Sequence, residues 1–524
     1  MESPYTVINA SAGSGKTYTL VQRLLMICLK YPAQHTTIRN ILALTFTNKA
    51  ANEMKERILS WLGKFASDQY ENNADLIGIR QELENQGIHV TLQDLHERSK
   101  KLLDYILHHY SILNIGTIDK FNSRLVRSFS YELGLAKNFN LEIQSEPFLI
   151  EAVDQMLDKI GDDEDLSETL MDYVNYGLDN EKRTNLNKTL YDSAKRFVND
   201  IHYEHLKKNQ NFNGEHYRNS TLKLRNEIKK LQQESVSLAE KSLMLIQKQG
   251  LENADFAGGG KVCIQYFFDG FLRTGEPKLF DCEEDELKRI EKYREGASKK
   301  GKVKEHLIFE ILDQLIENRQ KIIENFIAVQ KKKKILSALL PLKVHQDIQK
   351  ELNEIEEEND VVLLSKFNIL IHENLKNEPS EFIYEKVGTQ FQHYFFDEFQ
   401  DTSLLQWQNL LPLRNHSLSA EGTSFTLVGD PKQSIYRFRG GDSQLMMDII
   451  NHNEETPHPA KVINLKENWR SAKNIVRFNN ELYQFISKNL KEEHRDIFGK
   501  DAWQTAKSEM TGRVKVHLIE NDIK

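Results

Sequence analysis

The stretch ASAGSGKT, residues 10–17, decides how this chain folds. Tyr5 to Ile8 before it is apolar, as in a short buried strand, and Tyr18 to Lys30 after it carries apolar residues at helical spacing. The order strand, glycine loop, helix is typical of a loop whose backbone N–H groups and helix N-terminus attract phosphate oxygens. We therefore expect nucleotide phosphates to be bound by Ala10, Ser11, Ala12, Gly13, Ser14, Gly15, Lys16 and Thr17.

Lys16 and Thr17 have separate roles in such a loop. Lys16 would reach the β and γ phosphates of ATP, and Thr17 would bind Mg²⁺. The general pattern G-x-x-x-x-G-K-[ST] has glycine where this chain has Ala10. The alternative is a glycine-rich turn followed by a chance Lys-Thr pair, but it leaves the flanking strand and helix unexplained. A phosphate loop alone does not name the reaction.

Length and composition limit the class of protein. A chain of 524 residues is long enough for about three or four domains. We expect no secretory signal and no membrane span, because no apolar run is long enough. The scattered cysteines Cys28, Cys263 and Cys282 argue against a disulfide framework and a zinc site and fit a cytoplasmic protein. The net charge of −8 gives no global signal for nucleic acid, so such binding must depend on local patches.

Five further apolar runs predict strands. They alternate with helices, of which residues 48–58 form the next, and this alternation favours a parallel sheet with ligands at the carboxyl ends of its strands. The predicted strands are residues 38–46, 114–118, 393–396, 424–428 and 461–465.

Candidate nucleic-acid contacts follow two of these strands. Phe46 could stack on a base while Asn48 and Lys49 meet a backbone phosphate. The alternative is that Phe46 belongs to the core and Lys49 to a solvated helix start. Thr117 could bind sugar-phosphate, or Thr117 or Asp119 could simply cap the next helix.

Two adjacent carboxylates, Asp397 and Glu398, end the strand at residues 393–396. In an NTPase, Asp397 would orient Mg²⁺ while Glu398 accepts a proton from the attacking water. The alternative is a charged turn after a buried strand. The phosphate loop in the same chain favours the first interpretation.

The segment after residues 424–428 combines two kinds of chemistry. Gln433 is placed to sense a γ-phosphate, and Tyr436, Phe438 and Arg439 offer flat faces on which unpaired bases can stack. Beyond the last predicted strand, Arg470 is a candidate for reaching the γ-phosphate across a domain interface.

Residues 138–379 differ from the rest of the chain in being polar, charge-rich and helical in pattern. Residues 218–249 and 305–334 are the longest predicted helices. The lysine runs 298–302 and 331–334 could lie along a nucleic-acid backbone, but a solvated helix face is the more usual explanation. We interpret the region as a helical domain inserted between strands of the α/β domain.

Six peptides together resemble those of superfamily 1 DNA helicases of the UvrD, Rep and PcrA type. In the family's order they are ASAGSGKT, LTFTNKAANEMKERI, GTIDKF, DEFQDTS, LVGDPKQSIYRFRGGD and LKENWRS. The long insertion and the peptide VGDPKQSIYRFR resemble those of the AddA and RecB branch of the family. Asp119 stands where relatives usually have histidine, and Ala10 replaces glycine as it does elsewhere in this branch.

This resemblance implies two RecA-like domains that bind ATP in their cleft and move 3′ to 5′ on single-stranded DNA. The first would comprise residues 1–137 and 380–455, around the insertion at 138–379, and residues 456–524 would begin the second. ATP and Mg²⁺ would be bound by Lys16, Thr17, Asp397, Glu398, Gln433 and Arg470. DNA would be bound by Phe46, Asn48, Lys49, Thr117, Tyr436, Phe438 and Arg439.

The resemblance also implies partners. DNA duplex ends would be the substrate in repair or recombination, and an AddB-like subunit would complete a helicase-nuclease whose nuclease part lies outside this chain. We expect the chain to stop before the arginine that completes the ATP site from the second domain. On that expectation it binds ATP and single-stranded DNA weakly, hydrolyses ATP slowly and does not unwind duplexes.

Two other classes remain open. A P-loop kinase for a small metabolite would share residues 10–17 but would not need the segment after residue 428. A scaffold protein that has kept only the fold would not need Lys16, Asp397 and Glu398 intact.

Overall fold

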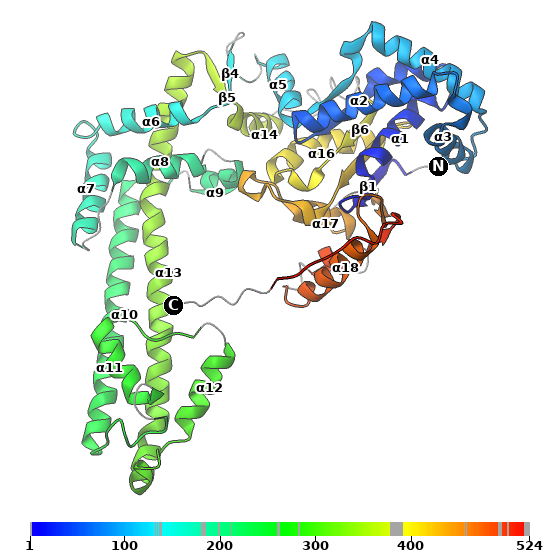
Figure 1. Ribbon diagram of the computed structural model, residues 1–524. Helices are drawn as coiled ribbons and strands as arrows, with labels where there is room; N and C mark the ends of the chain where they lie inside the picture. The colour runs from blue at the N-terminus through cyan, green and yellow to red at the C-terminus, as the bar shows by residue number, and fades with distance from the viewer. Residues whose placement is uncertain are drawn as a thin grey trace. The chain divides into compact units, whose positions relative to one another are not determined.

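In the computed structural model the chain divides into two compact units (Figure 1). Unit 1 takes its residues from 1–145, 197–204 and 356–524, and unit 2 from 146–196 and 205–355. The described residues are 3–130, 133, 135, 139–179, 185–197, 200–209, 211–258, 262–280, 283–377, 391–454, 456, 458–490, 495–499 and 502–517. The domain limits predicted at residues 137, 138, 379, 380 and 455, and Cys282, lie outside them.

Unit 1 is built on a six-stranded parallel sheet in the order β3-β2-β6-β7-β1-β8. Each strand overlaps one of the apolar runs that predict strands. Their bounds are β1 Tyr5–Ala10, β2 Ile41–Thr45, β3 Asn114–Thr117, β6 His393–Phe396, β7 Ser424–Gly429 and β8 Lys461–Leu465. The predicted α/β class with a parallel sheet is confirmed.

One predicted strand begins later in the structure than its apolar run indicates. The strand predicted from residue 38 begins only at Ile41, because Gln34–Asn40 forms a 3-10 helix. β8 pairs with β1 from Thr6↔Lys461 to Ala10↔Leu465, so it completes the first sheet. The second RecA-like domain predicted from residue 456 stays a prediction.

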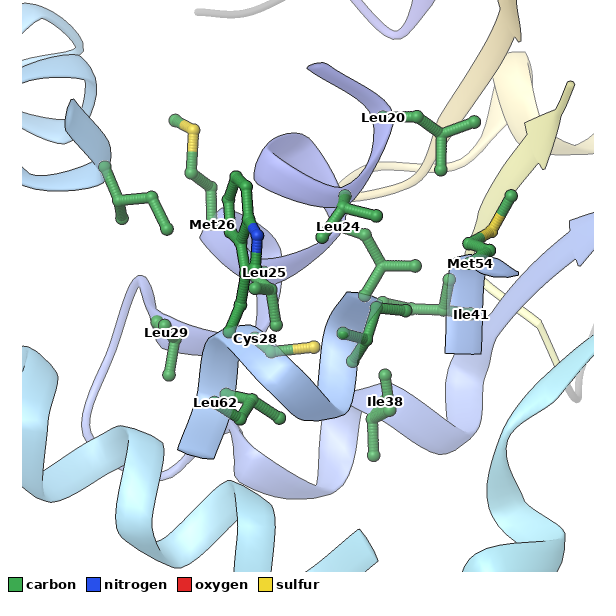
Figure 2. Close-up of a cluster of buried hydrophobic side chains, with 14 of the residues drawn as sticks. Leu20, Leu24, Leu25, Met26, Cys28, Leu29, Ile38, Ile41, Met54 and Leu62 are labelled. Carbon is green, nitrogen blue, oxygen red and sulfur yellow. The ribbon is translucent and has the colours of Figure 1, made fainter. Parts of the chain in front are cut away.

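Four helices pack on one face of the sheet. In α1, Lys16–Leu29, the side chains of Leu20, Leu24 and Leu25 are fully buried. Figure 2 shows the labelled side chains of α1 beside those of its neighbours. The other three helices are α2 Asn48–Phe65, α3 Ala74–Asn85 and α4 Leu92–His108.

A second core covers the opposite face. Successive strand residues point to opposite sides, so Val7 belongs to this core while Ile8 belongs to the first. The helices on this face are α5 Ile118–Ser128, α14 Phe367–Asn377, α16 Leu404–Ser419 and α17 Ser443–Ile450. The sheet is thus buried on both faces, and the carboxyl ends of its strands remain open to ligands.

Shorter elements complete unit 1. β4, Asn140–Glu142, pairs in parallel with β5, Val361–Leu363. After β8 the chain forms β9, Glu467–Asn468, α18, Lys473–Ser487, and β10, Thr505–Ala506, which pairs with β9.

Unit 2 is helical in its described residues, and its two longest helices lie side by side (Figure 1). The predicted helices at 218–249 and 305–334 are confirmed, as α10 and the first part of α13. The helices that lie wholly or mostly in unit 2 are α6 Glu146–Asp158, α7 Glu164–Asp179, α8 Leu186–Phe197, α9 Tyr203–Lys208, α10 Gly214–Lys248, α11 Ile264–Thr274, α12 Glu283–Arg294 and α13 Glu305–Glu358.

Three polar contacts show that α10 and α13 run antiparallel. Seven or eight residues separate successive contacts on α10, which is the heptad spacing of a coiled coil. The pairs are Ser242 with Asn318 at 2.9 Å, Ser235 with Asn325 at 3.3 Å and Glu227 with Lys332 at 2.6 Å. At least Lys332 of the lysine run 331–334 is thus paired within unit 2. Among the described residues, none of the helices is both long and apolar enough to cross a bilayer.

The half-buried His393 predicts a pH-dependent stability of unit 1. Its Nδ1 lies 2.9 Å from Ser424 Oγ, and burial, with a smaller effect of Lys30, lowers the pKa of His393 from 6.5 to about 4. The folded pKa lies below the unfolded value, so this stability is complete above pH 6.5 and is lost as the pH falls towards 4.

From pH 7 to pH 5 the wild type should lose about 1–2 kcal/mol more unfolding free energy than His393→Gln, which stays neutral. Urea unfolding at both pH values measures this difference. His89→Gln, at an exposed position, is the matched control. Equal losses in wild type and His393→Gln would contradict the assignment.

Candidate functional site

The loop between β1 and α1 has the geometry of a phosphate cradle. Gly13 and Gly15 have φ angles of +81° and +88°, which residues with a side chain rarely adopt. Gly15 directly precedes α1. Ser14 N donates to Ser11 O at 3.1 Å and closes the turn. Backbone N–H groups at the start of α1 therefore point towards the space that an anion would fill.

Lys16 meets the carboxylate pair that follows β6. Its Nζ lies 2.9 Å from Glu398 Oε2, across 382 residues of sequence. The Lys16 side chain is 12% exposed and the Glu398 side chain 34% exposed, so the pair is partly open to water. The contact brings two predicted ATP-site residues together at the edge where the parallel strands end.

The carboxylates crowd negative charge into a buried place. Asp397 is 6% exposed, and burial, followed by the charge of Glu398, raises its pKa to about 6. Burial and Glu398 likewise raise the pKa of Asp401 to about 6. A divalent cation beside Asp397 and the Thr17 hydroxyl would relieve this repulsion, so the residues fit Mg²⁺. Within the described ranges no three His, Cys, Asp or Glu side chains form a ready-made metal cluster.

Gln433 lies in the short turn Pro431–Gln433 that follows β7. Its Nε2 donates to Asp430 Oδ2 at 2.6 Å, and Lys432 Nζ bonds Asp430 Oδ1 at 2.8 Å. Asp430 is 1% exposed and so anchors the turn. A cavity of about 220 Å³ opens beside it, and its lining includes Ser11, Ala12, Gln433, Asn468 and Ser471.

The segment that carries Arg470 is fastened to the phosphate loop. Asn468 Nδ2 donates to Ala12 O at 3.0 Å, and Trp469 N donates to Gly13 O at 2.9 Å. A Cβ on Gly13 would lie 3.0 Å from Arg470 Cβ. Judged from its sequence position alone, Arg470 is an ordinary surface arginine. In the structure the exposed Arg470 is held beside the phosphate loop.

Sequence reasoning missed Trp469 and Asn468. The Trp469 side chain is 63% exposed beside the cradle, and Lys507 Nζ lies 5.5 Å from its ring centroid. An exposed indole next to a phosphate site offers a flat face to a purine. The signal for Trp469 was an aromatic directly before Arg470, whereas the contacts of Asn468 depend on tertiary structure.

An aromatic cluster lies past the ends of β2 and β7. The rings of Phe46 and Tyr436 are 4.7 Å apart, and those of Tyr436 and Phe438 are 6.0 Å apart. The Arg439 guanidinium lies 5.9 Å from both Tyr436 and Phe438. Phe46 is half-buried against this cluster, and Phe438 is 71% exposed. Four predicted DNA contacts are therefore gathered on one surface.

The remaining predicted DNA residues have local partners. Asn48 and Lys49 are exposed at the start of α2, where Lys49 Nζ lies 3.9 Å from Glu53 Oε1. The hydroxyl of Thr117 accepts from Lys120 N and caps α5, which is the alternative considered for it. Their contacts with DNA stay predictions.

Comparison with known proteins agrees with this geometry. Residues 2–454 match the model of the UvrD/REP helicase N-terminal domain. Relatives named as subunits of an ATP-dependent helicase/nuclease are also similar to the chain. The relative from Lactobacillus johnsonii is 25% identical over 92% of this chain and 38% of its own length. The relative from Clostridioides difficile is 25% identical over 99% of this chain and 41% of its own length.

This chain spans about two fifths of the length of those relatives. The family model covers most of the chain, including the phosphate loop, the carboxylate pair and the aromatic cluster. The chain therefore belongs to the UvrD/REP helicase family.

Proposed function

We propose that this chain is the ATP-hydrolysing motor of a DNA helicase that moves 3′ to 5′ on single-stranded DNA. The contact between Lys16 and Glu398 carries the proposal, because it joins a phosphate cradle to a candidate general base. The aromatic cluster around Tyr436 lies past the ends of strands in the same sheet and supports a nucleic-acid partner.

Bound ATP would change the partner of Lys16. Its ammonium would move from Glu398 to the β and γ phosphates, and the freed carboxylate would accept a proton from the attacking water. Thr17 and Asp397 would hold Mg²⁺, which neutralises phosphate charge when it is bound. Gln433 and Arg470 would contact the γ-phosphate and stabilise the charge that develops on it.

Single-stranded DNA would bind by stacking. Phe46, Tyr436, Phe438 and Arg439 offer aromatic and guanidinium faces, which bind bases of any sequence. Asn48, Lys49 and Thr117 are proposed to meet the sugar-phosphate backbone, which makes binding salt-dependent.

The names of the relatives suggest an assembly. We propose that the chain acts with an AddB-like subunit on DNA duplex ends, in the cytoplasm, in repair or recombination. A P-loop kinase would not explain the aromatic cluster, and a scaffold would not explain the pairing of Lys16 with Glu398. The slow hydrolysis expected of this chain stays a prediction, which steady-state rates with and without single-stranded DNA measure.

Substitutions at Lys16 and Glu398 should separate binding from hydrolysis. Lys16→Ala removes the ammonium that binds phosphate and should abolish ATP binding, measured with a fluorescent ATP analogue. Glu398→Gln should keep binding and lower the hydrolysis rate by about a hundredfold or more, because an amide cannot accept the proton. Lys64→Ala, at an exposed lysine of α2, is the control. Normal hydrolysis by Glu398→Gln would show that the general base is another group.

Loss of the stacking faces should weaken DNA binding without changing sequence preference. Tyr436→Ala and Phe438→Ala should each cost about 1–3 kcal/mol of binding free energy on oligonucleotides of any sequence. Fluorescence anisotropy at several salt concentrations measures this, and the salt slope should persist because phosphate contacts remain. Tyr110→Ala, an exposed aromatic just before β3, should bind normally. A loss confined to one base sequence would contradict stacking.

A further inference from the structure

Gln400 lies between the Glu398 carboxylate and the turn that carries Gln433, and no step above uses it. It follows β6 in the 3-10 turn Phe399–Asp401 and is 1% exposed. A buried amide must be hydrogen-bonded, because burial has removed it from water. The partners of Gln400 therefore show which groups it holds in place.

Both ends of the Gln400 amide are bonded. Nε2 donates to Glu398 Oε2 at 2.7 Å, and Oε1 accepts from Asp430 N at 3.0 Å. The main chain adds a link, since Ser434 Oγ donates to Gln400 O at 3.1 Å. The fit is tight, because a Cβ on Gly429 would lie 2.6 Å from Gln400 Oε1. One side chain thus ties the end of β6 to the end of β7.

We infer that Gln400 is a positioning residue that holds the Glu398 carboxylate in one place relative to Gln433. Lys16 bonds the same oxygen, Glu398 Oε2, and would leave it for a bound phosphate. Gln400 then remains as the donor that keeps the carboxylate oriented, while Asp430 holds Gln433. This inference rests on the proposed function, in which Glu398 and Gln433 face the γ-phosphate.

Gln400→Glu tests this role in this chain with nearly unchanged side-chain volume. A carboxylate still accepts from Asp430 N, but it cannot donate to Glu398 and repels it. We expect kcat for ATP to fall about tenfold or more while KM changes less than about twofold, since the lost bond matters in the transition state. Affinity for a fluorescent ATP analogue and for single-stranded DNA should stay at the wild-type level.

Gln406→Glu is the matched control. Gln406 lies in the first turn of α16, and its Oε1 accepts from Ser403 N in a capping box. A carboxylate accepts the same bond, so the substitution should leave kcat, KM and the melting temperature unchanged.

The exchanged pair Glu398→Gln with Gln400→Glu separates folding from positioning. An amide at 398 can donate to a carboxylate at 400, which restores the hydrogen bond with reversed direction. We expect the melting temperature lowered by Gln400→Glu to recover in the exchanged pair, measured without nucleotide. Hydrolysis should stay absent, because the carboxylate has moved away from the attacking water.

The outcomes are distinct. A wild-type chain with no measurable ATP hydrolysis, even with single-stranded DNA present, overturns the proposed function and this role with it. A wild-type chain that hydrolyses ATP, together with a Gln400→Glu variant of equal kcat, overturns this role alone. The positioning role of Gln400 is also overturned if two results occur together. The fall in kcat is then no larger than the loss of folded protein, and the exchanged pair does not recover the melting temperature.

Discussion

The common direction of six strands is the constraint on which the site depends. Parallel strands buried on both faces end at one edge, so polar groups from distant parts of the chain meet there. Register then fixes their positions: Leu44 pairs with Phe396, and Asp397 N donates to Leu44 O at 2.8 Å. Lys16 reaches Glu398 only because β1 and β6 both flank β7.

Much of this arrangement could be predicted, because strands buried on both faces read as continuous apolar runs. The glycine loop and the carboxylates after β6 were found for the same reason, since each follows such a run. The 3-10 helix before Ile41 was missed because Ile38 is buried as a strand residue would be. The contacts of Gln400 with Asp430 and of Asn468 with Ala12 leave no local signal, since these partners lie 30 and 456 residues away in sequence.

Unit 2 shows how buried polar residues select one register. Ser242 pairs with Asn318, and Ser235 with Asn325, in the seam between α10 and α13. A slip by one heptad would bring Asn325 opposite Ser242 but would leave Asn318 and Ser235 without the partners that they have in the observed register. An unpaired buried amide costs about 1–3 kcal/mol. The observed register is therefore favoured over registers shifted by one heptad, which would bury the same apolar positions but leave a buried amide unpaired. Sequence periodicity predicted the helices, and the polar pairs determine how they are aligned.

Glu398 combines backbone strain with its proposed role as general base. Its φ of +55° is costly for a residue with a side chain, by about 1–2 kcal/mol, and it turns the chain sharply after β6. That turn places the Glu398 carboxylate under Lys16 while Asp397 stays buried, so two adjacent acids face different partners. A relaxed backbone would point both carboxylates differently and separate the ammonium from its partner. The strain at Glu398 is therefore the local condition for the separate roles proposed for the two carboxylates.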